Sequence, residues 1–128
     1  MSGLRKTTPW HEIGHMVEHL NPNALRISKA FIAARTAGEI PVQLRKLFPN
    51  IKYGVNEITK KDNFISPYIG KEYTDASEVL SVGLEGVFCD GRFEKRIIQS
   101  NGKYDIEYAK IEDDKEYLNL IIGLILLA

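Results

Sequence analysis

Apolar residues recur every three or four positions along several stretches of this chain, a spacing that is typical of helices with one buried face. Thr8 is a good N-cap for the first stretch, and Pro9 suits the first helical position, where its missing N–H is not needed. Asn23 can cap the second stretch and Gly38 can end it. Residues 51–73 contain glycine and proline among aromatic and charged residues, which predicts a short strand and an extended loop. The helices predicted from these signals cover about residues 10–19, 24–37, 41–48 and 75–88.

A different period, of two residues, predicts a β-hairpin between residues 93 and 111. An Asn101-Gly102 pair separates two β-prone runs there, which is the usual signal for a tight turn. A last helix follows, in which Asp113 and Glu116 have capping-box spacing. The predicted fold class is therefore α+β, mostly helical with one hairpin. In the second run of the hairpin, alternate positions are apolar or aromatic, as in a half-buried strand: Tyr104, Ile106 and Tyr108.

Length and composition suit a single globular domain, residues 1–128. Apolar residues make up 44% of the chain and charged residues 27%, which excludes a disordered segment. Lys and Arg number 17, as do Asp and Glu, so the charge gives no reason to expect a nucleic acid or an anionic membrane as a partner. The longest apolar run, residues 118–128, is shorter than the ~20 residues that span a bilayer. We therefore expect it to form a buried C-terminal helix or a surface for a partner.

The polar start of the chain, residues 1–9, lacks the apolar stretch of a signal peptide. Cys89 is the only cysteine, which excludes an intrachain disulfide and a Cys-rich zinc finger and fits a reducing compartment. We therefore expect a cytoplasmic location.

All three histidines lie within the first predicted helix, and two of them form the H-E-x-x-H motif His11-Glu12-Ile13-Gly14-His15. Residues four apart on a helix project from one face, so the imidazoles of His11 and His15 can reach a single metal ion. Glu12 lies beside them and can accept a proton from a water activated by the metal. The alternative is a solvated helix face that carries this pattern by chance. His19 could replace a ligand in geometry, but we expect a surface or supporting role for it.

The apolar residues of the same helix include Ile13, Met16, Val17 and Leu20. We expect them to pack against the core and so to hold the histidines in place. Glu18 is predicted to be a solvated charge.

Catalytic zinc usually has three protein ligands and one open position, so a third ligand is expected downstream. Glu78 and Glu85 lie seven apart on an otherwise apolar helix, hence on nearly one face, which is unusual unless a buried positive partner is present. Glu78 is therefore the predicted third ligand, and Glu85 or Ser81 could orient a histidine N–H. Two alternatives remain open: Cys89 as the ligand, or Asp75 as a helix cap whose capping box Glu78 completes.

The motif with its downstream glutamate helix resembles the gluzincin branch of zinc metallopeptidases. More closely, the chain resembles the zincin-like domain of phage and prophage minor head, or head-morphogenesis, proteins. This resemblance covers about residues 11–127. It is carried by the H-E-x-x-H motif and by the runs Arg35-Thr36-Ala37-Gly38-Glu39, Tyr68-Ile69-Gly70-Lys71-Glu72-Tyr73 and Glu78-Val79-Leu80-Ser81-Val82-Gly83-Leu84-Glu85.

The resemblance implies a zinc (Zn2+) metallopeptidase with a peptide or protein substrate, located in a bacterial cytoplasm or a virion. The zinc would lower the pKa of its water toward ~7. Glu12 would take the proton and pass it to the leaving amine. Tyr73 is the expected stabiliser of the oxyanion, with Tyr68 second.

One departure from this family is that zincin domains form a sheet before the motif helix. Here about eight residues precede that helix, so residues 51–59 and the hairpin would replace the sheet, or the chain is a fragment of a larger protein. The alternative function is a phage head structural or assembly module, with phage head proteins as partners and a structural or degenerate zinc site. A third possibility is a helical protein without a metal.

Overall fold

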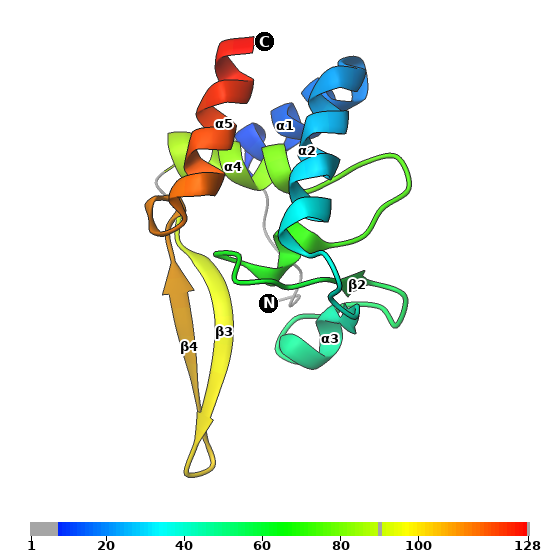
Figure 1. Cartoon of the computed structure of the whole chain (residues 1–128). Helices are drawn as coiled ribbons and strands as arrows, with labels where there is room; N and C mark the ends of the chain where they lie inside the picture. Colours follow the sequence, from blue (N-terminus) through cyan, green and yellow to red (C-terminus); the bar gives the residue numbers. More distant parts are fainter. Residues whose placement is uncertain (1–7, 90, 128) are drawn as a thin grey trace.

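The computed structural model describes residues 8–89 and 91–127 of the chain. These residues form five α-helices and two antiparallel strand pairs, joined by loops and short 3-10 helices (Figure 1). The predicted α+β class is confirmed. Part of the polar N-terminal stretch, residues 1–7, and the last residue of the apolar run, Ala128, lie outside the described residues. The helices are α1 (Pro9–Leu20), α2 (Pro22–Arg35), α3 (Leu44–Leu47), α4 (Val79–Phe88) and α5 (Lys115–Leu127), with two 3-10 helices, η1 (Pro67–Gly70) and η2 (Ile111–Asp113). The strands are β1 (Val42–Gln43), β2 (Ile58–Thr59), β3 (Phe93–Ser100) and β4 (Lys103–Ala109).

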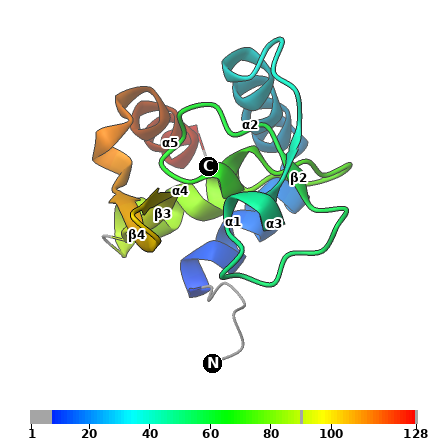
Figure 2. The same ribbon diagram turned by 90° about the horizontal axis from the view of Figure 1, so that it is seen from below.

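Helix α4 is the central element, with α1, α2 and α5 packed around it (Figures 1 and 2). Every residue from Val79 to Gly86 is buried. Such a helix is apolar on nearly all sides and needs neighbours on all of them. Gly83 allows a close approach of α5, because a Cβ at this position would lie 2.3 Å from the Ile121 side chain. Helix α4 therefore fixes the positions of the other helices.

Helix α5 is buried along one face only, as Tyr117, Ile121 and Leu124 are buried while Leu126 and Leu127 are exposed. The prediction of a buried C-terminal helix is thus correct for that face. None of the described helices combines the length and the apolar character needed to cross a bilayer.

Helix α1 meets α4 with its polar face, contrary to the prediction, although Val17 does pack against the core as expected. His11, Gly14 and Glu18 are buried, whereas Met16 is 60% and Leu20 is 72% exposed. The reason is the steric fit between the two helices. A Cβ at Gly14 would lie 2.4 Å from the Ser81 Cα atom, so the backbones can approach this closely only along a face without a side chain at the crossing.

The predicted start of α1 is confirmed, since the Thr8 hydroxyl accepts a hydrogen bond from the His11 N–H at 3.3 Å. Helix α2 starts earlier than predicted. Its cap is Asn21 and not Asn23, because the Asn21 side chain accepts from the N–H groups of Asn23 and Ala24 while Pro22 takes the first helical position.

The starts of α4 and α5 also differ from prediction. Helix α4 begins at Val79, so Asp75 lies before it and cannot cap it. Helix α5 is capped by Asp114, whose carboxylate accepts from the Tyr117 N–H at 3.1 Å. Asp113 instead accepts from the Lys110 N–H within η2. For these two helices, short-range spacing therefore found the element but not its first residue.

The predicted hairpin is confirmed as the antiparallel pair β3 and β4, joined by Asn101 and Gly102. Both turn residues have positive φ, 51° and 76°, which is why this dipeptide fits. The hairpin projects from the helices (Figure 1), so its outer part has no core to cover. The prediction of a half-buried β4 is therefore wrong there: Tyr104 is 67% exposed.

Strands β1 and β2 form a second small sheet, in which Val42 pairs with Thr59. This pairing explains why α3 is shorter than the predicted helix over residues 41–48: Val42 and Gln43 hydrogen-bond in the sheet instead. Lys71 adds a bridge to Thr59 on the other side of β2.

Substitution of Gly14 tests the helix crossing. We expect Gly14→Ala to lower the free energy of unfolding by about 1–3 kcal/mol, because the new Cβ would overlap the α4 backbone. Gly123→Ala is the matched control, since a Cβ at Gly123 in α5 meets nothing within 4 Å. It should raise stability by up to about 1 kcal/mol through helix propensity. Urea unfolding measures both, and equal effects of the two substitutions would contradict the close crossing.

Candidate metal centre

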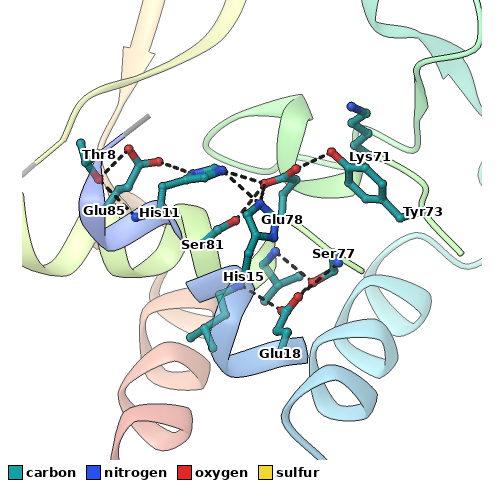
Figure 3. A network of polar contacts seen from close by, with 12 residues as sticks. Thr8, His11, His15, Glu18, Lys71, Tyr73, Ser77, Glu78, Ser81 and Glu85 are labelled. Atoms are coloured by element: carbon teal, nitrogen blue, oxygen red, sulfur yellow. Dashed lines mark hydrogen bonds and ion pairs between the residues drawn. The ribbon is translucent and has the colours of Figure 1, made fainter. Parts of the chain in front are cut away.

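Two side chains of α1 and one from the start of α4 converge between these helices (Figure 3). The His11 Nε2 and His15 Nε2 atoms are 3.2 Å apart. The Glu78 Oε1 atom lies 3.2 Å from the former and 3.1 Å from the latter. The three atoms thus form a nearly equilateral triangle. His11, His15 and Glu78 are the residues that the sequence predicts as metal ligands, and together they could hold a metal ion.

Each corner of this triangle is an atom that can bind a metal ion through a lone pair. Imidazole nitrogens and carboxylate oxygens repel one another at this distance unless positive charge lies among them. A shared proton or a metal ion can provide that charge. The side chains of His11 and Glu78 are buried, while 31% of the His15 side chain is exposed, so the cluster reaches solvent beside His15.

The Glu78 carboxylate is held on both of its oxygens. The Ser81 hydroxyl donates to Oε1 at 2.8 Å, and the Tyr73 hydroxyl donates to Oε2. Burial raises the pKa of Glu78, but the interactions with the His11 and His15 rings and the hydrogen bond from Tyr73 outweigh it, so the pKa lies well below its usual range. Glu78 occupies the N-cap position of α4, yet its side chain caps nothing. The capping-box alternative is therefore wrong, and Ser81 supports Glu78 and not a histidine.

The His11 ring is oriented by Glu85, as the sequence suggested. The His11 Nδ1 atom lies 2.8 Å from the Glu85 Oε1 atom, and both side chains are buried. Because a carboxylate accepts, the proton belongs on Nδ1, which leaves the Nε2 lone pair for the cluster. The Thr8 hydroxyl donates to the other oxygen of Glu85 at 3.1 Å, so the residue that caps α1 also holds this carboxylate.

Tyr73 lies at the cluster but is engaged with Glu78. Burial and the hydrogen bond to Glu78 raise the pKa of Tyr73, so its hydroxyl remains protonated and acts as a donor. The hydrogen bond with Tyr68 raises this pKa further. The Lys29 ammonium group donates to the carbonyls of Tyr73 and Thr74 at 2.8 and 2.7 Å, which ties this loop to α2.

The remaining candidates lie outside the triangle. Glu12 is exposed on α1, directly after His11, and within residues 8–89 and 91–127 its carboxylate forms no ion pair. His19 is exposed and does not belong to the group that could hold a metal, in agreement with the surface role expected for it. Cys89 is exposed at the end of α4 and is not part of that group either.

Glu18 is a buried polar residue beside the cluster whose burial the sequence did not predict. It is only 2% exposed, and its carboxylate accepts hydrogen bonds from the backbone N–H of Ser77 at 3.1 Å and from its hydroxyl at 2.7 Å. The prediction of a solvated charge is wrong. A signal was present: Glu18 lies three residues after His15 and seven after His11, on the same face of the helix.

Metal binding at the triangle can be measured as a gain in stability. Zn2+ at a hundred times its Kd should raise the free energy of unfolding of the wild type by about 2.7 kcal/mol. We expect His15→Ala to abolish this gain, because it removes one of three ligands. His19→Ala, one helical turn further along α1, should retain the full gain. Thermal unfolding with and without Zn2+ provides the readout, and a gain that depends on His19 instead would contradict the assignment.

Comparisons with protein-family models, with curated proteins and with solved structures find no match to this chain. The resemblance to zincin domains therefore stays a prediction from the residues themselves.

Proposed function

We propose that this chain is a zinc-dependent peptidase domain in which His11, His15 and Glu78 hold the metal. The observation that carries this proposal is the triangle of ligand atoms, with edges of 3.2, 3.2 and 3.1 Å. In a tetrahedral zinc site with bonds of about 2.0–2.1 Å, neighbouring ligand atoms lie about 3.3 Å apart. The spacing thus suits zinc. The donor set of two imidazoles and one carboxylate is also one that catalytic zinc uses.

Two features favour a catalytic over a structural site. Structural zinc sites usually have four protein ligands, whereas the group found among the described residues has three. The exposed part of His15 gives the cluster access to solvent. Bound zinc supplies Lewis acidity, which polarises a carbonyl group and makes water acidic enough to ionise near neutral pH.

Glu12 is the proposed general base. It follows His11 directly on α1, so its side chain projects about 100° around the helix from His11, on the side of the exposed His15. A base at this place has access to both solvent and substrate. Its carboxylate would take a proton from the attacking water and later deliver it to the leaving amine.

Tyr73 is the proposed donor to the oxyanion of the tetrahedral intermediate. A tyrosine hydroxyl keeps its proton at neutral pH even with its usual pKa of about 10, so it can donate to such an oxygen. The hydroxyl donates to Glu78 in this structure, so a substrate oxygen would have to replace that acceptor. Until then Tyr73 keeps the second oxygen of Glu78 away from the triangle.

Substitution of Glu12 separates catalysis from metal binding. We expect Glu12→Gln to reduce cleavage of fluorescently labelled casein by about 10²–10⁴-fold, since it removes the proton acceptor. Zinc content should stay at the wild-type level because Glu12 is not a ligand. Glu112→Gln is the matched control, an exposed glutamate in η2, and should cleave casein like the wild type.

Two outcomes would count against a peptidase. If Glu12→Gln cleaved casein as fast as the wild type, Glu12 would not be the base. If the zinc-loaded wild type cleaved neither casein nor a peptide library, the metal would be structural, as in the alternative of a phage head assembly module.

A further inference from the structure

Glu18 is a buried carboxylate that the proposed chemistry does not use. Its oxygens accept three hydrogen bonds, from the N–H and hydroxyl of Ser77 at 3.1 and 2.7 Å and from the Leu80 N–H at 3.4 Å (Figure 3). All three bonds cross from α1 to the start of α4. They offset the cost of burying a carboxylate, together with the positive end of the α4 dipole.

These bonds take the place of a local cap for α4. The first N–H groups of a helix have no partner within it. The Val79 N–H donates to the Ser77 hydroxyl at 3.2 Å, and the Leu80 N–H donates to Glu18. Glu78, which is the N-cap residue by position, is thereby free to turn its own carboxylate toward the histidines.

We propose that Glu18 is a positioning residue for the metal centre, which holds the backbone on both sides of Glu78 against α1. The inference rests on the proposed metal site. The same helix face then carries His11, His15 and the group that fixes the third ligand. A change at Glu18 therefore alters the distance from the Glu78 carboxylate to both imidazoles without removing a ligand.

Glutamine at this position tests the proposal with little change in size. Its amide group has one acceptor oxygen, so Glu18→Gln leaves one or more of the three donors without a partner. We expect the Kd for Zn2+ of the folded protein to rise by about 10–100-fold, as is typical when groups that orient metal ligands are replaced. Competition with a chromophoric chelator measures this Kd.

Ile121→Val is the control for a general loss of stability. It trims a buried side chain that packs on α4 at Gly83 and leaves the start of that helix alone. Its Kd for Zn2+ should stay within about twofold of the wild type. A Kd that rises equally in Ile121→Val and Glu18→Gln, or that does not rise in Glu18→Gln, overturns the positioning role.

Amide hydrogen exchange of the metal-free protein gives a second readout that does not depend on zinc. We expect exchange at Ser77 and Leu80 to be at least about tenfold faster in Glu18→Gln than in the wild type, while exchange in α5 is unchanged. Unchanged exchange at these two amides overturns the inference even if zinc binds. If the wild type binds no zinc but this exchange is faster in Glu18→Gln, the proposed function fails, while the anchoring of the Glu78 backbone is supported.

If Glu18→Gln does not fold, Ser77→Ala tests the same contact from the other helix. It removes the hydroxyl that donates to Glu18 and accepts from Val79. The expected rise in the Kd for Zn2+ is in the same direction. A wild-type Kd in this variant, with wild-type exchange at Leu80, overturns the proposal.

Discussion

The close crossing of α1 and α4 at Gly14 is the constraint on which the rest of the structure depends. Because a glycine lies against the Ser81 backbone, the two helix axes approach closely enough for side chains to hydrogen-bond across the crossing. The contacts then run in opposite order along the two helices: His11 meets Glu85 and Glu18 meets Ser77, on either side of the crossing. A bulkier residue at Gly14 would separate all of these groups together.

This interface is built from polar groups that would each be costly to bury alone. His11, Glu18, Glu78 and Glu85 are all buried, and each has a partner that offsets the loss of hydration. The apolar core lies mainly among α4, α5 and residues 64–69, with α2 packed against it. The central helix therefore has two kinds of surface, with the polar cluster toward α1 and apolar packing toward the other helices.

The sequence predicted the helices, the hairpin and the three residues of the triangle, since each leaves a local sign. Imidazoles four apart share a face, and acidic residues seven apart are out of place on an apolar helix. What it could not predict depends on partners far along the chain. The outward direction of Met16 and Leu20 and the late start of α4 follow from how α1 docks, which no short-range period records. The prediction of Asn23 as the cap of α2, where the structure has Asn21, is a smaller error of the same local rules.

The hairpin contacts the core at its base, which limits how far a change at its tip can disturb the helices. Only its base contributes to the core, through Phe93 and Ala109, while the strands beyond have free edges on both sides. Such a ribbon can open from its tip at little cost while the central helices stay folded. Fluctuations, insertions or substitutions near Asn101 therefore need not disturb the histidines, and the hairpin can change during evolution independently of the helices.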